Sequence, residues 1–416
     1  MAATTDIKRR APAFALLAVI GPGIIAASAG NDSGGISTYS VAGAKYGYAM
    51  LWMMLAMTPS FAIVQEMAGR MGAVTGKGFS ALIRERFGVR PTFFAMMLLL
   101  TSNAATTVAE FAGIAAAMQL FGVSKYISVP IAAIVVWMLV VRGSYRNVEK
   151  VLLALSSVFI AYVVAAFLAR PDWGVVAKSF VVPTIIPTQA FIALAIGLTG
   201  TTIAPWMQFL VQSNIVDKGT TVKEWALARW DVIIGAIAAN LIACFIIITT
   251  ATVLHPAGVE ITSAGEAAGA LAPLAGPYAE MLFSIGLLSA SVLAAAVLPL
   301  TASYAICEAF GFESGLDRSW AEAPIFNGIY TFVIAVGAAF ILIPGLDLIA
   351  IMLVSQVVNG MLLPFLLIFM MVITNDRRIM GRHVNTGLNN VLAWTTIAVV
   401  VSLTVVLLGM TVLGIG

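Results

Sequence analysis

The chain has 416 residues, of which 61% are hydrophobic and 10% are charged, and it carries a net charge of +3. A soluble domain is about half apolar and about a quarter charged, so this composition excludes a soluble enzyme, a disordered scaffold and a disulfide-rich secreted module. The two cysteines, Cys244 and Cys307, lie far apart in apolar runs and provide no disulfide framework. The small net charge argues against nucleic acid as a partner.

Eleven apolar runs are predicted to be membrane-spanning helices, because a spanning helix needs about 20 mostly apolar residues. In chain order they cover residues 12–43, 46–66, 92–121, 127–141, 151–169, 188–216, 231–254, 279–307, 325–343, 347–373 and 390–414. We therefore expect residues 1–416 to form a single transmembrane domain of an all-α polytopic membrane protein.

The lysines and arginines predict how these helices are oriented. Counting loops alternately from a cytoplasmic N-terminus places 18 basic residues inside and 4 outside, which together are the 22 of the chain. Such an excess inside follows the positive-inside rule. We expect a multi-pass protein of the plasma (inner) membrane with a cytoplasmic N-terminus and, after eleven spans, an extracellular C-terminus.

Two of the predicted helices, the first and the sixth, are interrupted. Residues 29–35 read AGNDSGG and residues 197–206 read GLTGTTIAPW. Glycine costs about 1 kcal/mol and proline about 3 kcal/mol inside a helix, so both runs are predicted to unwind and to turn free carbonyls toward a cavity or a ligand.

The places of these two breaks suggest an internal repeat. They would be equivalent in two five-helix repeats of opposite orientation, residues 12–169 and 188–373, with 390–414 as an extra helix. Paired breaks in inverted halves indicate a transporter site. The alternative is that the small residues serve helix packing.

Asp32 and Glu110 are the two acidic residues predicted to lie deep in the membrane, where a charge is costly. No lysine or arginine is predicted at the depth of Asp32, so we expect a passing cation to be its counter-charge. The alternatives are an N-terminal helix cap for Asp32 and, for Glu110, a buried acid bonded to a neighbouring helix.

Several segments together resemble the NRAMP family of divalent-metal transporters. They are residues 21–52 around the first break, VQEMAGRMGAVTGKGFSALIRERFG at 64–88, TTVAEFAG at 106–113 and SQVVNGMLLPF at 355–365. The resemblance implies a LeuT-like fold with two inverted repeats of five helices and an eleventh helix.

The chain departs from the family pattern at both breaks. Gly35 stands where the family has the asparagine of its Asp-Pro-Gly-Asn motif, and Ala204 and Trp206 stand where it has the methionine and histidine of Met-Pro-His. Thr107 replaces the aspartate of the helix-3 pattern that is tied to proton movement. The start of the ninth span also lacks the arginines that relatives carry.

These departures imply a change of metal. Losing a methionine sulfur and an asparagine oxygen removes two ligands and leaves a roomy site, which suits a partly hydrated Mg²⁺ better than a dehydrated soft ion. The chain thus resembles the magnesium-transporting branch of the family, which implies alternating-access transport of Mg²⁺ and Mn²⁺. Because titratable groups are few, we expect no proton coupling. The alternatives are a proton-coupled Mn²⁺/Fe²⁺ transporter and a LeuT-fold carrier of an organic substrate.

The expected ion site combines ligands from three helices. Its metal ligands would be Asp32, the backbone carbonyls of Ala29, Gly30 and Thr201, and the side chains of Gln356 and Asn359. Asn31, Ser33 and Thr202 would form a second shell, Thr107 and Glu110 would mark any remaining coupling route, and Trp206 would form a wall. For Gln356 and Asn359 the alternative is hydrogen bonding between helices. We expect no enzyme activity and no cofactor, only transported divalent ions and the lipid bilayer as partners of a monomer.

Overall fold

A computed structural model describes residues 31–141, 161–315 and 318–414 of the chain. The predictions for Ala29 and Gly30, for the first half of span 1 and for the start of span 5 fall outside these residues. Within the described residues every regular element is a helix, which confirms the all-α class.

The helices of the described residues follow the predicted spans closely. They are α3 (Ser33–Tyr46), α4 (Leu51–Thr75), α5 (Phe79–Phe87), α6 (Val89–Leu120), α7 (Lys125–Val141), α9 (Ala161–Ala169), α10 (Trp173–Val181), α11 (Gln189–Thr202), α12 (Pro205–Asp217), α13 (Val222–Val253), α14 (Ala264–Ala268), α15 (Ala272–Ala275), α16 (Ala279–Phe310), α17 (Pro324–Ile341), α18 (Leu348–Asn375), α19 (Arg377–Met380) and α20 (Gly387–Leu413), with short 3₁₀ turns at Gly269–Leu271 and Gly276–Tyr278. The largest shifts of a boundary are nine residues: α4 ends nine residues after the predicted end at residue 66, and α13 begins nine residues before the predicted start at residue 231, where Thr221 and Glu224 form a capping box.

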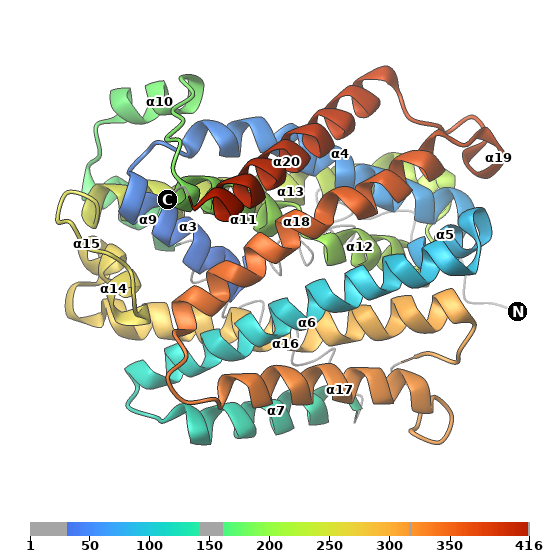
Figure 1. Cartoon of the computed structure of the whole chain (residues 1–416), viewed down its shortest axis with the longest axis horizontal. Coiled ribbons are helices and arrows are strands. Elements are labelled where there is room, and N and C mark those ends of the chain that lie inside the picture. The colour runs from blue at the N-terminus through green and yellow to red at the C-terminus, as the bar shows by residue number, and fades with distance from the viewer. Residues whose placement is uncertain (1–30, 142–160, 316–317, 415–416) are drawn as a thin grey trace, which may run out of the picture.

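Among the residues described, seven segments are long and apolar enough to cross a membrane: Val89–Leu120, Gln189–Asp217, Val222–Val253, Ala264–Phe310, Pro324–Ile341, Leu348–Asn375 and Gly387–Leu413. The predicted total of eleven spans stays a prediction. Figure 1 shows these long helices running side by side along one direction of the molecule.

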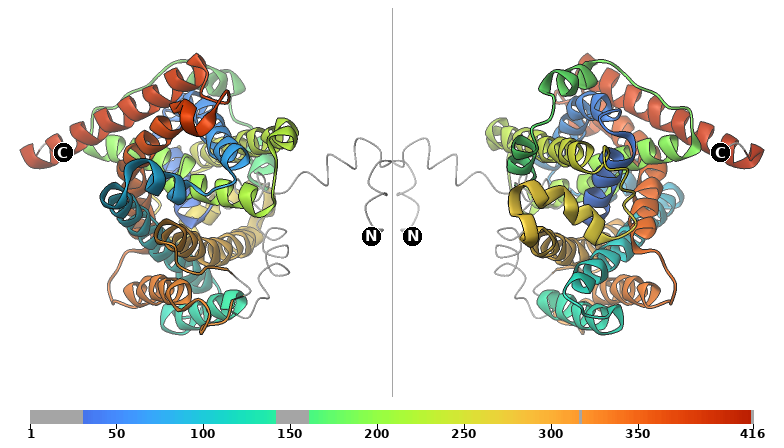
Figure 2. Two further views of the ribbon diagram at one scale, coloured as in Figure 1. Left: turned by 90° about the vertical axis from the view of Figure 1, so that its right-hand side faces the viewer. Right: turned by 90° about the vertical axis from the view of Figure 1, so that its left-hand side faces the viewer.

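The helices that carry the breaks lie at the centre. α3 packs against α13, α18, α11 and α6, while α11 packs against α18. At the periphery α17 packs on α7. α20 also lies on the outside and has exposed valines and leucines. Figure 2 shows the C-terminal end of α20 extending away from the other helices. This arrangement keeps the interrupted helices away from the surface that lipid would cover.

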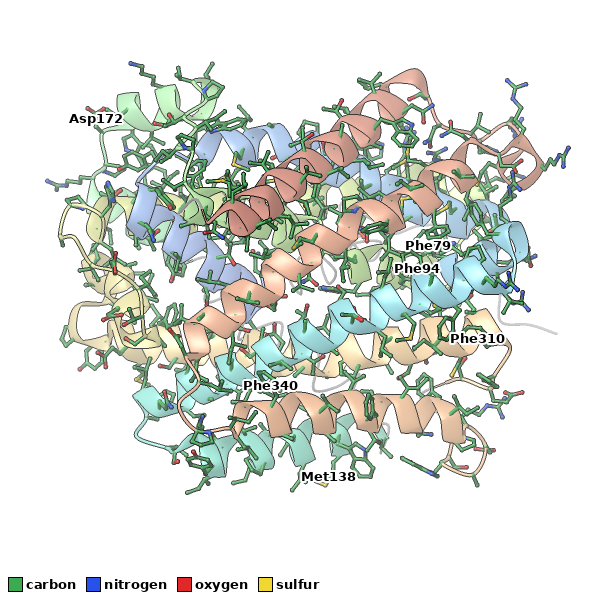
Figure 3. The ribbon with its side chains drawn as sticks, viewed as in Figure 1. Phe79, Phe94, Met138, Asp172, Phe310 and Phe340 are labelled. Carbon is green, nitrogen blue, oxygen red and sulfur yellow. The ribbon has the colours of Figure 1, made fainter. Side chains whose placement is uncertain are left out.

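The structure separates the connecting segments into two ends. At one end Arg86 forms a 2.8 Å ion pair with Asp376, and Arg70 binds Glu66 at 3.1 Å and the segment around Asn385 at 2.6 Å. All these residues lie in or next to segments predicted to be cytoplasmic. Figure 1 places α5 and α19 at this end, and Figure 3 places Phe79 and Phe310 there.

The segments predicted to be extracellular meet at the opposite end. Lys125 donates to the carbonyl of Ile343 at 2.7 Å, and the His255 ring lies 2.8 Å from the carbonyl of Ala44. α10, α14 and α15 lie at this end in Figure 1, as does Asp172 in Figure 3. The grouping agrees with the predicted sides, although which side is cytoplasmic stays a prediction.

The break in the sixth span is shorter than the sequence suggested. α11 remains helical through Gly197 and Gly200 to Thr202, and only Ile203 and Ala204 separate it from α12. The expectation that the glycines unwind the chain was therefore wrong. At Gly200 the reason is close packing, because a Cβ there would lie 2.1 Å from the carbonyl oxygen of Gln356 on α18.

Candidate functional site

The break between α11 and α12 leaves polar groups of Thr201 without helical partners. Pro205 begins α12 and has no amide hydrogen, so the Thr201 carbonyl lacks the donor that an uninterrupted helix would place four residues on. The Thr201 hydroxyl oxygen is buried and has no hydrogen-bond partner. Ala204 is extended, with φ −65° and ψ 139°, and its methyl group is buried. The predicted exposure of Thr201 to a cavity or ligand thus has a clear structural cause.

Asp32 forms the edge of the first break that the structure describes. It is the N-cap of α3, and its Oδ1 accepts the amide of Gly35 at 2.6 Å. The capping role weighed from the sequence is therefore present, and the helix that Asp32 caps begins at Ser33. Asp32 is only 3% exposed, so a carboxylate is held at the buried start of a helix.

A small cavity joins the two breaks. Its wall is formed by Asn31, Tyr39, Phe61, Thr201, Thr202, Met207, Ala239 and Asn240. About 10 Å³ is open to a water-sized sphere, which is roughly the space of one water molecule. Across the breaks, the Tyr39 hydroxyl lies 3.2 Å from the Thr202 hydroxyl. The sequence predicted Asn31, Thr201 and Thr202 as part of one site, and the structure brings them together.

Three polar or polarisable residues of this wall were not predicted from the sequence. Tyr39 lies two turns after Asp32, Met207 lies three residues after Ala204, and Asn240 is an amide within an otherwise apolar stretch of α13. The helical spacing of Tyr39 and Met207 and the polarity of Asn240 were the signals available in the sequence. The packing of α13 against α3 determines that Asn240 faces the breaks.

Gln356 and Asn359 have different places on α18. Gln356 lies against the first turn of α3, since a Cβ on Gly34 would be 1.9 Å from its Nε2 atom. Asn359 donates to Gln356 Oε1 at 3.1 Å and to Thr106 on α6 at 2.9 Å. It also accepts a 2.6 Å bond from Ser102. Asn359 therefore makes the hydrogen bonds between helices that were the alternative to a ligand role, while Gln356 lies beside the first break.

Glu110 is linked to the first break through Ser33. Its Oε2 accepts the Ser33 hydroxyl at 2.9 Å and the Ser33 amide at 3.3 Å, while Oε1 is buried without a partner. This matches the expected bond to a neighbouring helix. Thr107 is turned elsewhere, with its hydroxyl bonded to Asn103 O at 2.7 Å and its methyl group near Gly337 on α17.

Trp206 is fully buried beside the second break, and its indole Nε1 has no hydrogen-bond partner. It is not among the residues that line the small cavity. Within the described residues, no three His, Cys, Asp or Glu side chains gather into a group able to hold a metal ion.

Comparison with known proteins agrees with this arrangement of interrupted helices. Residues 23–409 match the family described as natural resistance-associated macrophage protein-like, or Nramp. The chain belongs to the Nramp family. The resemblance seen in the sequence motifs is confirmed over nearly the whole chain.

Relatives of this Nramp chain include proteins named divalent metal cation transporter MntH. The one from Deinococcus radiodurans is 28% identical over 403 residues, which cover 93% of this chain and 88% of the relative. The one from Burkholderia ambifaria is 29% identical over 410 residues, covering 95% and 89%.

Solved structures confirm the fold. A manganese transporter of Eremococcus coleocola has a TM-score of 0.78 at 23% identity, covering 98% of this chain and 89% of its own. MhsT, solved with L-phenylalanine, has a TM-score of 0.58 at 16% identity and covers 93% of this chain and 97% of its own. The predicted LeuT-like fold is therefore correct for this Nramp chain.

Proposed function

We propose that this Nramp protein carries Mg²⁺, and also Mn²⁺, across the membrane by alternating access, without moving protons and without enzyme activity. The divalent-metal part is supported by the names of its relatives and of the Eremococcus coleocola transporter. The finer choice of Mg²⁺ is supported by the donors around the breaks.

One observation carries the choice of metal: the polar donors around the breaks are oxygen-bearing groups, and Ala204 stands where the family resemblance implies a methionine. Asp32 supplies a carboxylate and Thr201 supplies a carbonyl and a hydroxyl, while Gln356 has its Nε2 toward the first turn of α3 and its Oε1 bonded to Asn359. Oxygen ligands and retained water suit Mg²⁺, which is reluctant to lose its hydration shell. Asp32 is the anchor of this proposed site.

The cavity is too small for a hydrated ion, so the proposed alternating access must enlarge it. Space for one water molecule does not hold a cation with several water ligands. In this proposal α3, α11 and α18 move apart to admit the hydrated ion from one side and to release it on the other.

The proposed absence of proton coupling rests on the groups near the breaks. Glu110 accepts two bonds from Ser33, which ties it to the start of α3, and Thr107, where the family pattern has an aspartate, carries no titratable group. A proton-coupled Mn²⁺/Fe²⁺ transporter is the second candidate, favoured by the thioether of Met207 in the cavity wall.

The test is metal uptake into proteoliposomes that contain a Mg²⁺-sensitive dye and, in a parallel set, a pH-sensitive dye. The wild type should take up Mg²⁺ without acidifying the interior. Asp32→Asn should lose at least about tenfold of this uptake, because asparagine caps a helix as well as aspartate but cannot supply the charge. Metal-driven acidification would exclude the uncoupled mechanism.

Asp32→Asn separates the two roles of this residue. Full uptake by this variant would show that the helix cap, rather than the charge, is the function of Asp32. An absence of Mg²⁺ uptake by the wild type, together with uptake of Mn²⁺ in a quenching assay, would favour the second candidate.

A further inference from the structure

Asn240 on α13 is held in one orientation by the helix beside it. Its Nδ2 donates to the carbonyl of Met54 at 2.9 Å and to the hydroxyl of Thr58, both on α4. The carboxamide nitrogen can only donate, and both of its partners accept. The Thr58 hydroxyl is an acceptor here because it donates its own hydrogen to Met54 O at 2.8 Å. The amide therefore cannot be reversed without losing these bonds, and Oδ1 is directed away from α4.

The oxygen of Asn240 and the hydroxyl of Thr201 share an unusual property. Both atoms are buried, in residues that are 4% and 1% exposed, and neither makes a hydrogen bond of good geometry; the Tyr39 hydroxyl lies near that of Thr201. An unsatisfied buried acceptor costs about 1–3 kcal/mol, and most such groups in folded proteins find a partner. Both residues line the cavity between the breaks, which has space for about one water molecule.

We propose that Asn240 and Thr201 are ion-site residues that hold one water ligand of the transported cation. This inference rests on the proposed function. A water bound to a metal ion gives a lone pair to the ion and keeps two hydrogens to donate. Asn240 Oδ1 and Thr201 Oγ1 are two acceptors that belong to residues of the cavity wall, one on α13 and one on α11.

The chemistry of this pocket selects a hydrated ion rather than a bare one. The residues that line it are neutral, so they offer little to a cation that has lost its water, but they are good acceptors for the polarised hydrogens of a metal-bound water. Asn31 lies in the same wall and is adjacent to Asp32, which connects the pocket with the proposed anchor of the ion.

The inference adds a specificity element to the site. Mg²⁺ keeps several waters in protein sites and therefore gains more from acceptors for those waters than Mn²⁺ does. Removing one acceptor should then weaken Mg²⁺ transport more than Mn²⁺ transport. A purely structural water in the same pocket would not produce this difference between metals.

The test compares two substitutions on the same helix. Thr201→Val removes the unpartnered hydroxyl with little change of shape. Thr199→Val removes a hydroxyl that is also buried on α11, but one that bonds the carbonyl of Ala195 at 3.0 Å and does not line the cavity. Uptake of Mg²⁺ and Mn²⁺ is measured in proteoliposomes over a range of metal concentrations.

Thr201→Val should raise the KM for Mg²⁺ about tenfold, the size expected for one lost hydrogen bond to a charged group, and should change the KM for Mn²⁺ less. Thr199→Val should leave both within about twofold of the wild type. Equal behaviour of the two variants, or an equal shift for both metals, would overturn the inference. Because the wild type is measured alongside, a failure of Mg²⁺ transport itself is recognised separately.

Asn240→Leu provides a second test, because it removes the other proposed acceptor, which lies on α13. It should raise the KM for Mg²⁺ similarly, and its melting temperature in detergent is measured as well because the bonds to α4 are lost. If both residues hold the same water, Asn240→Leu combined with Thr201→Val should be little worse for Mg²⁺ than either change alone. Additive losses would show that the two residues act on different species.

Discussion

Met207 is the residue in the cavity wall that most directly questions the choice of Mg²⁺. It is buried, and it lies in the first turn of α12, three residues after Ala204, the extended residue that precedes this helix. A thioether there offers soft transition ions a ligand that Mg²⁺ does not use. The identity of the metal at this site therefore depends on whether the sulfur reaches the ion.

Met207→Leu should leave Mg²⁺ and Mn²⁺ uptake within about twofold of the wild type, because the change conserves volume and the proposed ligands are oxygens. Competition by Cd²⁺ against Mg²⁺ measures any use of the sulfur. The matched variant Ala204→Met places a thioether at the family position and should strengthen Cd²⁺ competition. A large loss of Cd²⁺ competition in Met207→Leu would instead identify Met207 as a ligand.

At the scale of elements, the contact between α11 and α18 determines how closely two helices of the second predicted repeat approach each other. Gly200 allows the two helices to pack with backbone against backbone: a Cβ at this position would lie 2.1 Å from Gln356 O and 2.3 Å from the amide nitrogen of Gly360. Neither backbone atom can move without shifting α18. Gly197, one turn earlier, has only ordinary contacts, the nearest at 3.5 Å.

Gly200→Ala should lower the melting temperature in detergent and reduce uptake at least several-fold, since overpacking a close contact costs about 1–3 kcal/mol. Gly197→Ala should be neutral or slightly stabilising because alanine is the better helix former. Equal melting temperatures for the two variants would show that the helices separate easily at Gly200.

Features of the helices that depend on local sequence could be predicted, whereas features that depend on long-range contacts such as this one could not. The limits of most helices and the positions of both breaks follow from local properties, namely apolar length, Pro205 and the capping group of Asp32. The role of Gly200 does not, because it depends on a backbone more than 150 residues away in sequence, at Gln356. The same holds for Asn240, whose orientation is fixed by bonds to α4.

At the scale of the whole molecule, the connecting segments gather at two opposite ends, and their contacts follow the predicted sides of the membrane. The ion pair of Arg86 with Asp376 joins two predicted cytoplasmic segments, and the bond of Lys125 to Ile343 joins two predicted extracellular ones. The distribution of basic residues predicted this grouping. The burial of Arg70 could not be predicted from the charge distribution, because it depends on the bonds of Arg70 to the segment around Asn385.

The orientation itself is tested by cysteine labelling from one side of the membrane. Cys244 and Cys307 are buried and are first replaced by alanine. Lys178→Cys and Arg377→Cys then place single exposed thiols on α10 and α19, which are separated by five predicted spans and should lie on opposite sides. An impermeant maleimide should label Lys178→Cys in intact cells and Arg377→Cys only after permeabilisation.

Val405→Cys is the control for this experiment. Val405 is 63% exposed in the structure but lies within α20, where lipid rather than water should cover it, so its thiol should not react from either side. Reversed labelling of the other two variants would invert the orientation and leave the helix count intact. Labelling of both from the same side would mean that an even number of spans separates them, which would contradict the two inverted five-helix repeats.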